Sequence, residues 1–259
     1  MARHWHGGDG TVKGFRRSDR IRYGLSMDET HDDVLALFDG LRVADVRDGM
    51  DWVGLPHRGS VSRDITPVAP GMRLCGRAFT VRTRPSDKVV PHGISPEEYT
   101  AWAHEYWYGE VNTSKAWRDG LRPGDVVVIE GADLGVGEVG SNNSLGWHVL
   151  GAVGVVTSGG VRDVDEVTAQ GIPVFARHRS QSMTQGRIEF AEAGQPVALG
   201  DVVVRPGDVV VADGDGVIVV PVERAEEVAR YGRQELENDK AIRRGYYQSL
   251  GWALDETVK

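Results

Sequence analysis

Residues 154–165 read Gly-Val-Val-Thr-Ser-Gly-Gly-Val-Arg-Asp-Val-Asp and join an apolar run to two side chains that can carry chemistry. The run at 153–157 is short and continuous, which is typical of a strand covered on both faces of its sheet. The glycine pair at 159–160 is expected to turn the chain, and Asp163 is expected to cap the helix that follows. Arg162 and Asp163 are therefore predicted to lie in a turn between a buried strand and a helix.

The residues before this segment add a second turn. An apolar run at 126–129 precedes a glycine-rich loop at 135–143, and a helix is expected over about 143–150. Backbone N–H groups at a helix start form a natural seat for an anion. Arg162 offers a planar fork to a carboxylate, and Asp163 is a hard oxygen ligand suited to Mg²⁺ or Mn²⁺. If the two turns meet, they form an anion-plus-cation pocket of the kind that holds a 2-oxo acid.

Two other interpretations of these residues compete. An Arg-Asp pair is often an ordinary surface turn, and the dipeptide also occurs at 47–48, 63–64 and 118–119. Gly135, Gly137 and Gly140 match the spacing of a dinucleotide fingerprint between a strand and a helix. Residues 131–134, however, separate the strand from the first glycine, whereas the dinucleotide-binding turn is tighter. Dinucleotide binding is therefore a weaker interpretation than an anion-plus-cation pocket.

The rest of the chain alternates strands with helices. Short valine-rich runs separated by Gly and Pro predict strands at 77–84, 126–129, 153–157, 202–204, 209–211 and 217–220. Helices are expected from a capping box at Ser26 and Glu29, over 43–50, and over about 223–244 with Gly245 as the stop. The pattern predicts an α/β domain with many strands buried on both faces.

Two segments stand apart from this pattern. Residues 1–25 are basic and are predicted to form a surface arm, ahead of a domain over 26–250 and a tail over 251–259. An insertion at about 85–120 begins a helix at the capping sequence 95–98. We interpret five aromatic residues of the insertion as packing or a subunit interface rather than as a pocket lining. They are Trp102, Tyr106, Trp107, Tyr108 and Trp117.

Composition excludes several classes of protein. The 259 residues include 30 Lys and Arg against 38 Asp and Glu, a formal charge of −8, so no broad basic field is available for nucleic acid. The single cysteine, Cys75, excludes an intramolecular disulfide and a Cys-rich zinc module, which fits a reducing compartment. No apolar run approaches the ~18 residues of a membrane span. We expect a cytoplasmic protein that binds neither nucleic acid nor a membrane.

Several stretches of the chain resemble the RraA-like family. This family joins the regulators of RNase E activity with the hydroxymethyl-oxoglutarate and carboxy-hydroxy-oxoadipate aldolases, and some members carry a demethylmenaquinone methyltransferase-like name. The resemblance covers roughly residues 30–84 and 121–248 and leaves out the arm and the aromatic insertion. The stretches that carry it lie at 70–81, 122–131, 154–165, 171–176, 206–208 and 213–221.

The resemblance implies a single compact layered β/β/α swivelling domain that assembles as a homotrimer or homohexamer, with its active site at a subunit interface. It implies that Arg162 binds the carboxylate or keto oxygen of the substrate. Asp163 would ligate Mg²⁺ (or Mn²⁺), mostly through water, and Glu235 on the last helix would reach the site of a neighbouring subunit. The loop whose amides would bind the pyruvyl carboxylate comprises Gly140, Ser141, Asn142 and Asn143.

The chain departs from the aldolases at one position. They carry an aspartate twenty-one residues before the motif arginine, and here that position is Ser141. A serine cannot act as a charged group. Glu138 is three residues away and would substitute only if the loop is remodelled. The resemblance therefore supports binding of a metal ion and a 2-oxo acid by this chain more directly than it supports the retro-aldol step.

We therefore expect a class II, metal-dependent lyase acting on a 2-oxo or related hydroxy acid through a stabilised enolate, with Arg162, Asp163 and Glu235 as catalytic residues. Decarboxylation is favoured over retro-aldol cleavage because it needs no base to remove a hydroxyl proton. The alternative is a non-catalytic interaction protein of the RraA-like type, since a −8 surface suits a basic partner. A dinucleotide-binding oxidoreductase is the third interpretation.

Overall fold

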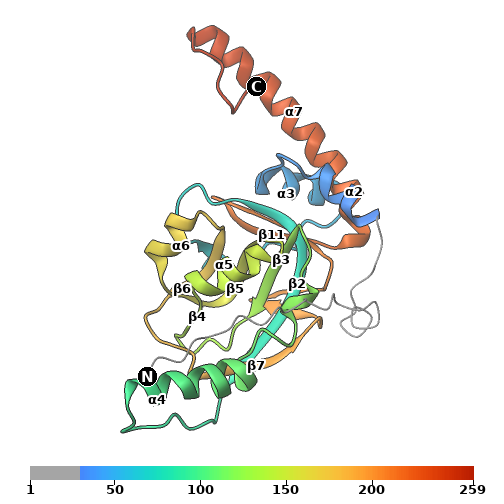
Figure 1. Cartoon of the computed structure of the whole chain (residues 1–259). Helices are drawn as coiled ribbons and strands as arrows, with labels where there is room; N and C mark the ends of the chain where they lie inside the picture. Colours follow the sequence, from blue (N-terminus) through green and yellow to red (C-terminus); the bar gives the residue numbers. More distant parts are fainter. Residues whose placement is uncertain (1–29) are drawn as a thin grey trace, which may run out of the picture.

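The structure is a computed structural model, and it describes residues 30–259 of the chain. The arm predicted over 1–25 and the capping box at Ser26 lie outside this range. In the described part, a mixed sheet is flanked by helices, and a long C-terminal helix projects away from it (Figure 1). The predicted α/β fold class is confirmed.

The six predicted valine-rich runs all form strands. The bounds of the strands are β1 Thr66–Pro67, β2 Leu74–Pro85, β3 Asp125–Glu130, β4 Gly137–Val139, β5 Ala152–Val161, β6 Val174–Arg179, β7 Ile188–Ala193, β8 Val197–Leu199, β9 Val202–Val204, β10 Val209–Asp213 and β11 Gly216–Val220. Five of these strands, β1, β4, β6, β7 and β8, were not predicted. The main sheet has nine strands in the order β1-β6-β5-β3-β2-β10-β11, with β4 paired to β5 and β7 to β2. The remaining two, β8 and β9, pair with each other.

The centre of the sheet is parallel and its margins are antiparallel. Strands β2, β3, β5 and β6 run parallel, whereas β1, β7, β10 and β11 pair antiparallel with their neighbours. Ser60 bridges to Ile218 of β11, and the chain then leads directly into β1 at the opposite edge. The sheet is therefore nearly closed.

Two buried clusters hold these elements together. The first fills the inside of the sheet and includes Phe79, Val127 and Phe175. The second lies where helices cover β10 and β11, and it includes Phe38 and Met50. Because the central strands are covered on both faces, their sequences are continuous apolar runs rather than alternating ones.

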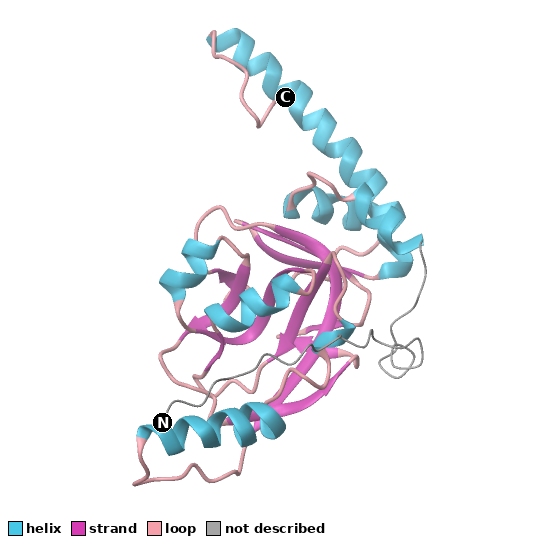
Figure 2. Cartoon of the chain, in the orientation of Figure 1, coloured by secondary structure: helices cyan, strands magenta, loops and turns pink. Residues whose placement is uncertain are grey.

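The helices surround the sheet unevenly. Their bounds are α2 Thr30–Leu37, α3 Val43–Trp52, α4 Pro96–Trp102, η1 Ala103–Val111, η2 Arg118–Gly120, α5 Ser141–Val149, α6 Val164–Gln170, η3 Val222–Arg224 and α7 Ala225–Leu250. Figure 2 shows α5 and α6 beside the sheet, with α3 and the start of α7 over one end. No helix of the described residues is long and apolar enough to cross a membrane.

Two glycine predictions are wrong. Helix α7 does not stop at Gly245 but continues to Leu250, and the φ of 66° at the following Gly251 suits a helix end. A single internal glycine costs a helix only about 1 kcal/mol, which α7 tolerates. The pair at 159–160 does not turn the chain, because it lies inside β5. A Cβ on Gly160 would lie 2.3 Å from the carbonyl oxygen of Val136, so close packing explains this glycine.

The insertion folds as the capping sequence predicts. The Ser95 hydroxyl accepts from the Glu98 N–H at 3.2 Å, and the Glu98 carboxylate accepts from the Ser95 N–H at 2.8 Å. Helix α4 then continues directly into the π-helix η1, beside β7 (Figure 1). Trp107 is fully buried and donates to Thr184 at 3.2 Å, and the Trp117 ring packs against Trp147. For Trp107 the packing interpretation is right.

Candidate active site

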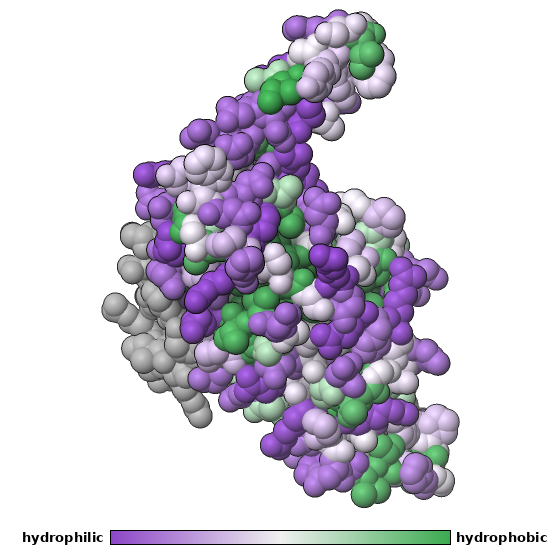
Figure 3. Space-filling view, turned by 180° about the vertical axis from the view of Figure 1, so that it is seen from behind, coloured by the Kyte–Doolittle hydropathy of each residue, from purple (hydrophilic) through white to green (hydrophobic). Residues whose placement is uncertain are grey.

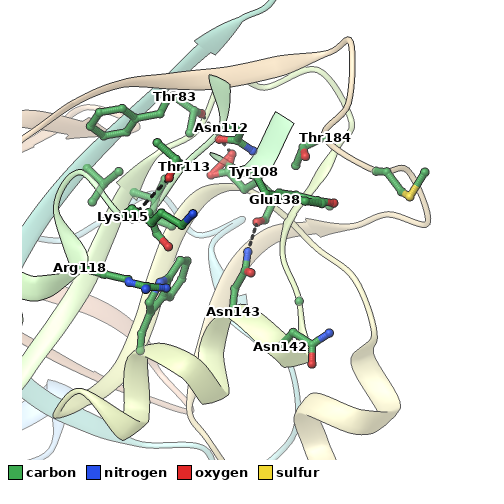
Figure 4. A pocket seen from close by; sticks show the side chains of 18 of the residues that line it. Thr83, Tyr108, Asn112, Thr113, Lys115, Arg118, Glu138, Asn142, Asn143 and Thr184 are labelled. Atoms are coloured by element: carbon green, nitrogen blue, oxygen red, sulfur yellow. Dashed lines mark hydrogen bonds between the residues drawn. The ribbon is translucent and has the colours of Figure 1, made fainter. Parts of the chain in front are cut away.

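A cavity of about 600 Å³ lies beside the loop that connects β4 to α5 (Figure 4). It unites two segments that are far apart in the sequence. One side, here called the sheet wall, includes Thr83, Glu138, Gly140, Asn142, Asn143, Arg162 and Asp163. The other side, the insertion wall, includes His104, Tyr108, Asn112, Thr113, Lys115 and Arg118.

On the sheet wall, Arg162 and Asp163 meet Ser141, the first residue of α5, which does not itself line the cavity. Arg162 Nε donates to Asp163 Oδ1 at 3.1 Å. Asp163 Oδ2 accepts from both the backbone N–H and the hydroxyl of Ser141, each at 3.3 Å. The arginine and aspartate side chains are about one third exposed, at 33% and 31%, so a ligand in the cavity can reach both. The two turns that the sequence singles out therefore lie side by side.

Asp163 has an uncommon backbone conformation. Its φ is 55°, and Asp133 is the only other non-glycine residue of the described range with a positive φ. Aspartate tolerates this left-handed region better than most residues, although at some cost in free energy. Asp163 occupies the position before α6, but its side chain makes no capping hydrogen bond. The capping prediction is therefore wrong, because the carboxylate lies against Ser141 instead.

The glycines of the G-x-G-x-x-G pattern allow this close approach. A Cβ on Gly137 would lie 2.7 Å from Arg162 Cβ, and one on Gly140 would lie 2.7 Å from Asp163 Oδ2. Gly137 is moreover part of strand β4, so the segment lacks the single strand–turn–helix form of a dinucleotide fingerprint. The pattern reflects packing of β4 against the Arg162–Asp163 turn.

Glu138 is buried in the same wall. Its Oε1 accepts from the Thr157 hydroxyl at 3.0 Å, and its Oε2 accepts from the Thr83 hydroxyl at 3.3 Å. Burial raises the pKa of this carboxyl to about 7, although the two threonine hydrogen bonds oppose the shift. Asn143 Nδ2 donates to the Glu138 backbone carbonyl at 3.3 Å, which ties α5 to β4. From the sequence, Glu138 is only a conditional substitute for the missing aspartate.

The insertion wall contains residues that sequence reasoning missed. Figure 4 shows Lys115 and Arg118 on one side of the view, with Glu138 and Asn143 on the other. Tyr108 is 41% exposed, and its hydroxyl accepts from Gln185 Nε2 at 2.8 Å. The interpretation of the aromatic residues as packing or a subunit interface rather than as a pocket lining is therefore wrong for Tyr108 and Trp117, which both line the cavity. No periodicity or motif marks these polar residues in advance.

Glu235 does not join the site within the described chain. It is half-buried on α7, which extends away from the sheet, and it does not line the cavity (Figure 1). Its predicted role at a neighbouring subunit's site stays a prediction. Asn142 and Asn143 do line the cavity, at the first turn of α5.

The donor set fits a hydrated hard cation. Glu138 and Asp163 are the carboxylates that line the cavity. Among residues 30–259, no group of three or more His, Cys, Asp and Glu side chains could enclose a metal ion. Mg²⁺ keeps several waters and binds through one or two carboxylates together with oxygens of the substrate. Asp163 fits this mode of binding, with the substrate supplying further oxygens.

Comparison with known proteins identifies the family of this chain. The family model described as Aldolase/RraA matches residues 43–219. The chain belongs to the RraA-like family. The match spans β1 to most of β11 and therefore contains every residue of the sheet wall. Glu235 and the whole of α7 lie beyond it.

Curated relatives match over parts of their lengths. The chain is 26% identical over 189 residues to Protein DlpA of Legionella pneumophila, a match covering 71% of this chain and 27% of that protein. It is 31% identical over 123 residues to a protein of Halalkalibacterium halodurans named "Putative 4-hydroxy-4-methyl-2-oxoglutarate aldolase", covering 47% of this chain and 58% of that protein. The chain thus spans less than two thirds of either relative.

Solved structures agree on the fold. An uncharacterized protein from Pseudomonas syringae has a TM-score of 0.64 at 24% identity, covering 88% of this chain and 98% of that one. Streptomyces coelicolor RraAS2, described as an unusual member of the RNase ES inhibitor RraA protein family, has a TM-score of 0.62 at 24% identity, covering 82% and 98%. At this identity the likeness shows the fold alone.

Proposed function

We propose that the protein is a divalent-metal-dependent lyase that breaks a carbon–carbon bond in a 2-oxo acid or a related hydroxy acid. The observation that carries this proposal is the meeting of Arg162, Asp163 and the start of α5 on one cavity wall. A guanidinium, a hard oxygen ligand and helix N-terminal amides together match the groups of a 2-oxo acid and its cation. We assign Mg²⁺ or Mn²⁺ as the cation.

The residues of the sheet wall have distinct roles in such a reaction. When bound at Asp163, a divalent cation supplies Lewis-acid stabilisation of negative charge on the keto oxygen. Arg162 adds fixed positive charge at the same place, where charge develops as the bond breaks. The Ser141 amide already donates to Asp163, so the amides of Asn142 and Asn143 are left to orient the substrate carboxylate.

The projecting helix favours a homo-oligomer. Beyond its core-packed first half, α7 exposes Ile242, Leu250 and the following Leu254, and Figure 3 shows hydrophobic residues near its end. A helix that its own chain leaves uncovered gains stability when a second copy buries these side chains. We therefore keep the trimer or hexamer, and the role of Glu235 at a partner's site, as part of the proposal.

A non-catalytic interaction protein is the alternative, and one measurement separates the two. Pyruvate release, coupled to lactate dehydrogenase, is followed from oxaloacetate and from 4-hydroxy-4-methyl-2-oxoglutarate, with Mg²⁺, with Mn²⁺ and with EDTA. Parallel reactions with metal ion but no protein give the background decarboxylation of oxaloacetate. We expect metal-dependent release above that background from at least one compound. Release at background rates from both would contradict the proposal.

A further inference from the structure

We infer that Glu138 is the proton-transferring residue of this cavity and performs the acid–base work for which Ser141 has no group. The inference rests on the proposed function, since it names the group that moves the proton in the same site. It goes beyond the resemblance, in which the residue at position 141 carries that role.

The environment of Glu138 is built around its carboxyl group. A Cβ on Gly159 would lie 2.7 Å from the carboxyl carbon, and a Cβ on Gly131 would lie 2.8 Å from Oε2. Gly159 of β5 and Gly131, which directly follows β3, are therefore glycines at positions where a side chain would displace the glutamate. A glycine inside a strand weakens that strand. The glycine at 159 nevertheless leaves the space that the Glu138 carboxyl group occupies.

The carboxyl group is held by neutral donors. Thr157 Oγ1 accepts the Gly159 N–H at 2.9 Å, which leaves its own proton for Glu138 Oε1. Thr83 Oγ1 accepts the Ala132 N–H at 3.1 Å and approaches Oε2. Within the described residues no cation pairs with this carboxyl. A buried glutamate held in this way can accept and release a proton, whereas one paired with arginine stays ionised.

Retro-aldol cleavage and decarboxylation share one proton transfer. After the bond between C3 and C4 breaks, its electron pair forms the enolate of pyruvate, and C3 must then take a proton. Glu138 in its acid form supplies that proton and is left as the carboxylate. In retro-aldol cleavage the carboxylate first removes the C4 hydroxyl proton, so the same proton returns to C3. In decarboxylation CO₂ leaves, and solvent reprotonates Glu138.

The raised pKa of Glu138, about 7, supports this role because both protonation states are then populated near neutral pH. Other ionisable groups share the cavity and act on the same site. Those on its walls are His104, Tyr108, Lys115, Arg118, Arg162 and Asp163. Burial, rather than any one of these charges, is the largest cause of the shift.

The test is exchange of the C3 hydrogens of pyruvate with deuterium from solvent, followed by NMR with the full-length protein and Mg²⁺. This reaction uses only the proton-transfer step. We expect Glu138→Gln, which keeps the size and hydrogen-bonding capacity of the side chain, to lower exchange by ~10²-fold or more. Glu192→Gln is the matched control, because Glu192 pairs with Arg82 and does not line the cavity. It should exchange within about twofold of the wild type.

A positioning variant and a titration complete the test. Thr157→Val keeps the volume but removes a hydrogen bond that lowers the pKa of Glu138, so the pH midpoint of exchange should move upward. The ¹³C shift of the Glu138 carboxyl in metal-free protein should report the same midpoint without any activity.

If Glu138→Gln exchanges like the wild type, the inference is wrong while the proposed function stands. If the wild type neither exchanges nor releases pyruvate, the proposed function fails, and with it the role assigned to Glu138.

Discussion

The two walls of the cavity differ in how they are built. The sheet wall places its side chains at the ends of buried parallel strands, where β5 and the loop before α5 fix their positions. The insertion wall is formed by the π-helix η1 and the short turns after it. Its charged residues Lys115 and Arg118 are exposed rather than buried. Rigid strand ends suit reacting groups that need fixed geometry, whereas an appended segment suits contacts that select among substrates. We therefore expect the sheet wall to determine the reaction and the insertion wall to determine specificity.

Asp163 provides the strongest test of the sheet wall. Asp163→Asn should reduce metal-dependent activity to the background of the metal ion alone, because an amide is a poor ligand for a hard cation. Asparagine also tolerates the left-handed φ of 55°, so the backbone need not change. The free energy of unfolding should change by less than ~1 kcal/mol. Coupled pyruvate release and urea titration measure both quantities, and full activity in a folded variant would falsify the metal role.

Glu138 makes the stability of the sheet wall depend on pH. Its folded pKa of about 7 lies above the ordinary glutamate value of 4.5, so the folded state favours the protonated carboxyl. The stability it contributes is fully present below about pH 4.5 and is lost as the pH rises to about 7. Glu138→Gln removes this loss, and relative to wild type the variant should gain roughly 3 kcal/mol between pH 4.5 and 8. Urea unfolding at the two pH values checks the sign. A difference that does not change with pH would show that the carboxyl titrates normally.

The sheet wall was largely predictable because its residues follow one another in a regular pattern. The valine runs at 126–129 and 153–157 predict buried strands, and adjacent parallel strands bring their ends together. The prediction of a turn failed at Gly159, because the sequence alone does not distinguish a glycine required by close packing from a glycine required by a turn. Glu138 illustrates the same limit, because only the fold shows that this charged residue is buried.

The insertion wall was not predictable in the same way. The capping box at 95–98 and the buried Trp107 follow from local sequence and from hydrophobicity. Which surface the segment covers depends on long-range contacts, such as that between Trp107 and Thr184, and these have no local signature. Lys115 and Arg118 therefore read as ordinary surface charges until the fold places them at the cavity.

Lys115 and Arg118 test the role of the insertion wall. Replacing both with alanine should raise KM about tenfold for a substrate with a second carboxylate, because two positive charges near its distal end are lost. The kcat should change little, since neither residue belongs to the sheet wall. Exchange of the C3 hydrogens of pyruvate, which lacks a second carboxylate, is the internal control and should be unaffected. An equal loss in both assays would place these side chains in the reaction itself.

Ser141 allows the sheet wall to be converted towards the aldolase pattern, with the smallest expected effect. In Ser141→Asp a second carboxylate would stand beside Asp163, whose Oδ2 now contacts the serine hydroxyl. Without a cation the two charges repel, and with one they share it, so Mg²⁺ should raise the Tm of the variant more than that of wild type. Retro-aldol release should increase severalfold relative to decarboxylation, about 1 kcal/mol in barrier. Ser141→Asn, which adds bulk without charge, is the control. If Mg²⁺ affects all three proteins alike, position 141 has no part in binding the cation, and Asp163 remains the one carboxylate assigned to it.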